Sequence, residues 1–181
     1  MRIWLGLVFA AGCSGPAPAQ TAQERIAQTP LDGFEVAHRA QNDVQSLEEW
    51  VPRGETVERW TRMVTIQRYS HSMGLGSPQT YLEQLAREVA QACPGLGASP
   101  VESITVSGRP GARLLAECPR NPTTGLPETF FAMAIAGTAN LHGVQFAFRR
   151  TPTASDLDWA ASQLESVVLC TARSREPVCR R

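Results

Sequence analysis

The chain has 181 residues, a formal charge of zero from 17 basic and 17 acidic side chains, and five cysteines. This balance excludes the cationic footprint of a nucleic-acid-binding domain, so we expect no nucleic-acid partner. Every basic residue is an arginine, and the lack of lysine excludes Schiff-base, P-loop and serine–lysine chemistry.

The first 19 residues have the pattern of an export signal. One arginine precedes about nine apolar residues between Ile3 and Ala11, which is too short for a membrane span of about 20 residues. Residues 17–19, Ala-Pro-Ala, form a small-x-small cleavage site. Cleavage there would remove residues 1–19 as a signal peptide and leave a periplasmic or secreted chain that begins at Gln20.

An alternative maturation uses Cys13. Residues 10–13, Ala-Ala-Gly-Cys, resemble the lipobox of bacterial lipoproteins, although Ala stands where Leu is preferred. Removal of residues 1–12 and acylation of Cys13 would make an inner- or outer-membrane lipoprotein, which contacts the membrane through its lipid alone. Both maturations take the chain out of the cytosol.

Four cysteines remain in the mature chain, and an even number in an oxidising compartment predicts two disulfides. Of the three pairings, position along the chain favours Cys93 with Cys118 and Cys170 with Cys179. The first closure would contribute about 3 to 4 kcal/mol on the chain-entropy model and the second somewhat under about 3 kcal/mol. The sequence has no C-x-x-C and no Cys/His pair at zinc spacing, so we predict no metal and no cofactor.

A mature chain of about 160 residues fits one domain with its own core. Residues 20–33 are polar, and within them we expect a loose helix or a disordered lead-in over residues 21–29. The single domain is expected to occupy residues 34–181.

The first strands are predicted by alternation. From Phe34 to Arg39 apolar and polar side chains alternate, as a half-buried strand requires. A turn at residues 41–43 would return the chain in a hairpin that ends at residues 52–54. Residues 60–69 are rich in β-branched and aromatic side chains and predict the next strand.

A helix is predicted after a glycine-bearing loop at residues 71–77. Ser77 is the expected N-cap and Pro78 the first helical residue. One face carries apolar residues at helical spacing, Leu82, Leu85, Val89 and Cys93. Residues 94–95, Pro-Gly, end the helix.

The second half of the chain predicts more strands. Residues 102–106 and 113–118 are two strand candidates joined by a turn at residues 108–111. Residues 129–136 and 143–149 are apolar and aromatic and predict a hairpin.

A second helix closes the predicted fold. Ser155 and Asp158 have capping-box spacing at its start, and its expected inner face carries Leu157, Ala161, Leu164 and Val168. The order of strands, helix, strands and helix indicates the α+β class, with two main helices packed on an antiparallel sheet.

Two stretches of the mature chain resemble a group of uncharacterised secreted bacterial proteins. One is residues 51–56, VPRGET, leading to residues 60–67, WTRMVTIQ. The other comprises Cys118-Pro119, Asn121, Thr124-Gly125, Pro127-Glu128, residues 147–149, residues 170–173 and Cys179. The order of elements also resembles PsbP-like α/β/α sandwiches. The resemblance implies a compact envelope domain with the cysteine pairing given above, and it implies no activity.

The sequence lacks G-x-S-x-G, H-E-x-x-H, Walker and dinucleotide signatures, so we predict no catalytic residue. His38, His71 and His142 are isolated along the chain. A hydrogen-bonded or solvent-facing role is favoured for each over that of a general base. His71 and Met73, with Met63, would offer soft ligands to copper.

Aromatic and arginine side chains are the remaining binding candidates. Trp60, Arg62 and Arg149, with Trp50 and Arg150, would supply a surface for an anionic partner. The simpler interpretation places the tryptophans in the core and the arginines at its rim.

The function expected from these observations is that of an exported, non-enzymatic envelope protein that binds a protein or another envelope component. The alternative is a periplasmic carrier of a small ligand or copper. A small hydrolase comes third, and a pocket that holds a histidine beside an acid and a hydroxyl would favour it.

Overall fold

The computed structural model describes residues 24–180, so the export signal, its cleavage sites and Cys13 lie outside the described residues. No helix within that range is long and apolar enough to cross a membrane. The elements follow the order β1 (Arg25–Ala27), β2 (Phe34–Gln41), β3 (Gln45–Pro52), β4 (Arg62–Ser70), η1 (His71–Met73), α1 (Pro78–Ala92), β5 (Gly97–Ala98), β6 (Glu102–Val106), β7 (Arg109–Cys118), β8 (Glu128–Ala136), β9 (Asn140–Phe148), α2 (Ala154–Ser166), β10 (Val168–Cys170) and η2 (Pro177–Arg180).

Eight strands form one antiparallel sheet in the order β2-β3-β4-β9-β8-β7-β5, with β6 also paired to β7. Hairpins supply most of the pairings, and the long pairing of β4 with β9 joins the two halves of the chain. Its register runs from Arg62 opposite Phe148 to Ser70 opposite Asn140. The α+β class predicted from the sequence is confirmed.

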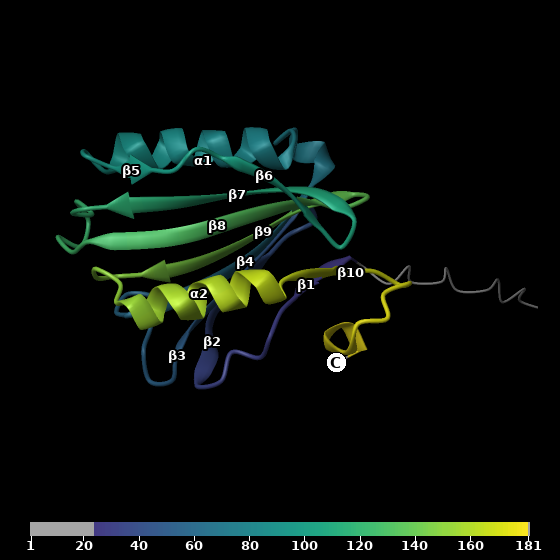
Figure 1. Cartoon of the computed structure of the whole chain (residues 1–181), viewed down its shortest axis with the longest axis horizontal. Coiled ribbons are helices and arrows are strands. Elements are labelled where there is room, and N and C mark those ends of the chain that lie inside the picture. Colours follow the sequence, from purple (N-terminus) through teal and green to yellow (C-terminus); the bar gives the residue numbers. More distant parts are fainter. Residues whose placement is uncertain (1–23, 181) are drawn as a thin grey trace, which may run out of the picture.

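The two helices cover opposite faces of this sheet (Figure 1). Successive residues of a strand point to opposite faces, and in β8 the buried Ala132 belongs to the same cluster as Leu82 of α1. Its neighbour Met133 belongs to the cluster that contains Leu164 of α2. The molecule is therefore an α/β/α sandwich with one apolar cluster on each side of the sheet.

The start of α1 is as predicted. The Ser77 side chain accepts a hydrogen bond from the Thr80 N–H, and Pro78 occupies the first turn, where its missing N–H leaves no partner unsatisfied. Leu82 is fully buried against the sheet. The helix ends at Ala92, and the next residue is a disulfide cysteine.

The start of α2 differs from the prediction. The N-cap is Thr153, whose side chain accepts from the Asp156 N–H while the Asp156 carboxylate accepts from the Thr153 N–H. Ser155 and Asp158 therefore lie inside the helix and do not cap it. Arg150 favours the cap at Thr153 over the predicted cap at Ser155, because its guanidinium donates to both Asp156 carboxylate oxygens at 2.6 and 2.8 Å.

The inner face of α2 shifts with its start. Leu157 and Ala161 are exposed, and Val168 belongs to β10, so only Leu164 of the predicted face packs inward. The buried residues of the helix are Asp156, Ala160, Gln163 and Leu164.

The predicted lead-in is a strand. Residues Arg25–Ala27 form β1 and pair antiparallel with β10, with Ile26 opposite Leu169. Ile26 and Ala27 are buried. The two strands lie side by side beyond the end of α2 (Figure 1), so the domain begins before the predicted boundary at residue 34.

The turn between β6 and β7 is shorter than predicted. β7 begins at Arg109, and the turn consists of Ser107 and Gly108, with φ of 50° and 72°. Two central residues with positive φ match the type I′ turn that joins twisted strands. The Ser107 hydroxyl accepts the Leu169 N–H at 3.0 Å, which ties this turn to β10.

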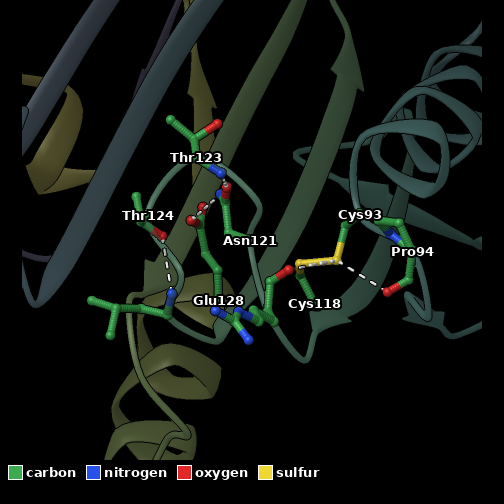
Figure 2. The surroundings of a disulfide bond; sticks show 9 residues. Cys93, Pro94, Cys118, Asn121, Thr123, Thr124 and Glu128 are labelled. Atoms are coloured by element: carbon green, nitrogen blue, oxygen red, sulfur yellow. Dashed lines mark hydrogen bonds between the residues drawn. A yellow bond between two sulfur atoms is a disulfide. The ribbon is translucent and has the colours of Figure 1, made fainter.

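Two disulfides join Cys93 to Cys118 and Cys170 to Cys179, the pairing that sequence position favours. The first links the end of α1 to the end of β7. Figure 2 shows the adjoining loop, where the Asn121 side chain accepts the Thr123 N–H and donates to Glu128. Disulfides of this kind persist in oxidising compartments, which fits an extracytoplasmic location.

Candidate functional site

The α2 face of the sheet has two hollows, which we name the α2 groove and the β1 pocket. The α2 groove has a volume of about 580 Å³ and lies between the second half of α2 and strands β6, β7 and β8. Its apolar lining comprises Ile104, Val106, Leu114, Leu115, Phe131, Met133, Ala161, Leu164 and Val167. Glu102, Arg113 and Glu165 add charge to its lining.

β6 borders the α2 groove and is an edge strand. In the described part of the chain it pairs only with β7, so the backbone groups along its other side are without a strand partner. One end of the groove is held by Arg113, which donates to both carboxylate oxygens of Glu102 at 2.9 and 3.2 Å. An apolar groove beside an open strand edge is the geometry that accepts an extended peptide.

The β1 pocket has a volume of about 450 Å³ and lies between β1 and strands β2, β3, β4 and β9. Its lining includes more charged and polar residues than that of the groove and comprises Glu24, Arg25, Ile26, Arg39, Ala40, Gln41, Ser46, Leu47, Glu48, Trp50, Ile66, Gln67, Arg68 and His142.

His142 is the most deeply buried polar group of this pocket, with 1% of its surface exposed. Its Nε2 atom has no hydrogen-bond partner. Burial lowers the pKa of His142 from 6.5 to about 4, further assisted by Arg68 and His71 and opposed by Glu24. The imidazole is therefore neutral at pH 7.

Glu24 faces the same end of the pocket. Its Oε2 accepts the Thr138 N–H at 2.7 Å. Partial burial alone would raise the pKa of Glu24, but hydrogen bonds from Thr138 and Ala139 and the nearby His142 outweigh it and lower the pKa. Within residues 24–180 no hydroxyl hydrogen-bonds to His142, so the pocket shows a histidine and an acid without an activated nucleophile.

The predicted binding residues do not form one surface. Trp60 is buried, and the Arg149 guanidinium lies over its ring at 4.0 Å while donating to the Glu58 carbonyl oxygen. Arg62 lies on the other face of the sheet, over the rings of Phe34 and Trp159. These arginines hold parts of the fold together.

The predicted copper ligands are also separated. Met63 is buried near the start of β4, whereas His71 and Met73 are exposed in η1 beyond its end. His38 is exposed on β2. Among residues 24–180 no group of three His, Cys, Asp or Glu side chains has the arrangement of a metal site.

Neither hollow was predicted from the sequence. The sequence pattern indicates apolar faces at Ile104, Val106 and Leu164. It does not indicate that these faces line a groove. For the β1 pocket, His142 and Arg68 share a register position on β4 and β9. The two residues could have been placed together only if the pairing of β4 with β9 had been predicted. That pairing joins segments far apart in the chain.

Fold and hollows together define a disulfide-bonded α/β/α sandwich with two hollows on its α2 face. Among solved structures, this chain is similar to the Ran-binding protein Mog1p of Saccharomyces cerevisiae, with 13% identity, a TM-score of 0.50 and coverage of 81% of this chain and 94% of that one. A point mutant of the protein Mog1 matches with 12% identity, a TM-score of 0.50 and coverage of 82% and 92%. This similarity shows a shared PsbP-like fold. No family model matches the chain, and no curated protein does.

Proposed function

We propose that the chain is an exported, non-enzymatic envelope protein that holds an extended segment of a partner protein against β6 and in the α2 groove. The observation that carries the proposal is the apolar groove beside an open strand edge. Export is supported by the signal pattern of residues 1–19 and by the two disulfides.

The groove has the composition of a protein interface, with an apolar centre and charged residues around it. An added strand would pair with the backbone of β6, and its alternate side chains would enter the groove over Ile104 and Val106. The mutual ion pair of Glu102 and Arg113 leaves that end without a net charge. We therefore expect a partner segment with alternating apolar residues. The Ran-binding protein Mog1p supports this mode only as a precedent that a protein of this fold binds a protein partner.

A site-specific photocrosslinker tests this proposal in cells that express the protein. Placed at Glu165, an exposed residue of α2 in the lining of the groove, it is expected to capture a discrete partner. Placed at Arg87, which is exposed on α1, it is expected to capture none. Equal capture from both positions would contradict the proposal.

Two substitutions give the matched comparison. Ile104→Glu introduces a charge into the half-buried wall of the groove and is expected to reduce capture about tenfold or more, the effect of about 1.4 kcal/mol. Leu157→Glu changes an apolar residue that is 39% exposed on α2 outside the groove and is expected to leave capture unchanged. Thermal unfolding of both variants separates loss of binding from loss of fold.

Intact mass and fractionation test export. We expect extracytoplasmic protein that starts at Gln20 or carries an acylated Cys13, with both disulfides formed. A cytosolic chain that retains residues 1–19 and has free thiols would overturn the envelope assignment.

A further inference from the structure

The β1 pocket is separate from the α2 groove and has properties of its own. Its volume of about 450 Å³ lies within the usual range of small-molecule sites, about 300 to 1,000 Å³. Trp50 and Ile66 supply an apolar wall, and three arginines and two glutamates surround it. The pocket therefore has the size for a small molecule and one positive charge in excess.

The acids of the pocket are already engaged. Glu48 accepts from the Arg39 Nε at 3.0 Å and from the Trp50 indole N–H at 3.3 Å. Glu24 accepts from the Thr138 backbone. These bonds leave neither carboxylate paired with Arg68.

Arg68 has donors to spare. Its guanidinium carries five N–H groups, and its side-chain hydrogen bond in the structure uses Nη1, at 3.1 Å from Asn140 Oδ1. No carboxylate in the described part of the chain forms an ion pair with it. A planar guanidinium of this kind suits the two oxygens of a carboxylate or phosphate.

His142 stands directly opposite Arg68 in the pairing of β4 with β9. Side chains at directly opposed positions lie on the same face, with Cβ atoms about 5 Å apart. The Nε2 of His142 is buried without a partner, and a buried polar atom without a hydrogen bond is unfavourable. One ligand oxygen within reach of both residues would satisfy this atom and engage the guanidinium.

We propose that the β1 pocket binds the oxyanion of a small molecule, a carboxylate or a phosphate, through the Arg68 guanidinium and the His142 Nε2–H. The apolar part of the ligand lies against Trp50 and Ile66. Glu24, held on the Thr138 N–H beside His142, restricts the pocket to ligands of low negative charge. This site is independent of β6 and of the proposed partner.

The test is a titration of the purified disulfide-bonded protein with benzoate and, separately, with inorganic phosphate, followed by NMR of the His142 imidazole and the Trp50 indole. Sodium chloride at equal ionic strength is the control. Binding of benzoate would assign a carboxylate ligand, and binding of phosphate a phosphate ligand. If neither anion shifts the His142 signals at concentrations up to about 10 mM, the proposal is wrong. That concentration is ten times a Kd of about 1 mM.

Substitutions separate the site from general attraction by charge. Arg68→Gln is expected to weaken binding at least about tenfold, because a charge-assisted pair is lost. Arg87→Gln removes the same charge from the exposed α1 surface and is expected to leave the affinity unchanged. Equal weakening by both variants would overturn the site. Thermal unfolding shows that each variant is folded at the titration temperature. His142→Gln, which keeps an amide donor, is the second substitution within the site and is titrated in the same way.

Discussion

His142 is a buried imidazole whose protonation is coupled to folding. Its pKa is about 4 in the folded chain and 6.5 when exposed, mainly because burial disfavours the cation. Between these values the unfolded chain binds more protons than the folded one. The free energy of unfolding should therefore fall as pH decreases from about 6.5 to 4, by up to roughly 3 kcal/mol.

Denaturant unfolding at several pH values measures this slope. His142→Gln should flatten the curve between about pH 6.5 and 4, since glutamine does not titrate. His38→Gln changes an exposed histidine and should leave the slope unaltered. A His142→Gln curve as steep as that of the unsubstituted protein would show that another group causes the slope.

Arg149 illustrates how a candidate binding residue becomes a structural one. Its guanidinium covers the ring of the buried Trp60 and holds the Glu58 carbonyl oxygen at 2.7 Å. Arg149→Met should lower stability by about 1 to 2 kcal/mol, from the lost cation–π contact and hydrogen bond. Chemical denaturation checks this value. Arg59→Met, at an exposed position of the loop between β3 and β4 that contains Glu58, should change stability by less than about 0.5 kcal/mol.

At the scale of elements, the two capping patterns of α2 give a direct test. Asp156 accepts from Thr153 and Arg150. Partial burial would raise its pKa, but these bonds outweigh burial and lower the pKa from 3.8 to about 2. Asp156→Asn should cost about 1 to 3 kcal/mol above pH 4, and the difference from the unsubstituted protein should shrink as pH falls from 4 toward 2.

The control for this prediction is Asp158→Asn, the acid that sequence spacing alone places in the cap. It lies within α2 and is exposed, so its replacement should change stability by less than about 0.5 kcal/mol. Equal losses in urea denaturation of the two variants would contradict the observed start of the helix.

Local signals predicted most of the elements. Alternation predicted β2, apolar and aromatic content predicted the hairpin of β8 and β9, and Ser77-Pro78 predicted the start of α1. The start of α2 was misplaced because residues 153–158 contain two overlapping capping patterns, and Arg150 selects the earlier one. β1 and β10 have three residues each, which is too short for a periodic signal, and their pairing joins the two ends of the chain.

The candidate sites belong to the scale of the whole molecule. The β1 pocket combines Glu24, Arg68 and His142, which come from the beginning, middle and end of the chain. The α2 groove needs α2 beside β6. Neither arrangement follows from local sequence, because it depends on which strands pair and which face each helix covers. Cysteine pairing was predictable because each bridge closes a short loop.

The paired strands β1 and β10 are expected to contribute to the stability of the complete fold. Ile26 packs into the α2-side cluster, and the Thr29 N–H donates to Ser166 Oγ at 2.9 Å. A chain that begins at Phe34 would lose these contacts and leave the buried Leu169 of β10 without its strand partner. Its stability should fall by about 3 kcal/mol or more.

A chain that begins at Glu24 is the matched control, because it retains every contact of β1. Thermal unfolding should give it the same midpoint as the chain that begins at Gln20, with the chain from Phe34 several degrees lower. Since β1 also forms one wall of the β1 pocket, the shortest chain should lose anion binding along with stability. Equal midpoints for all three chains would show that β1 adds nothing to the fold and that the domain does begin at residue 34.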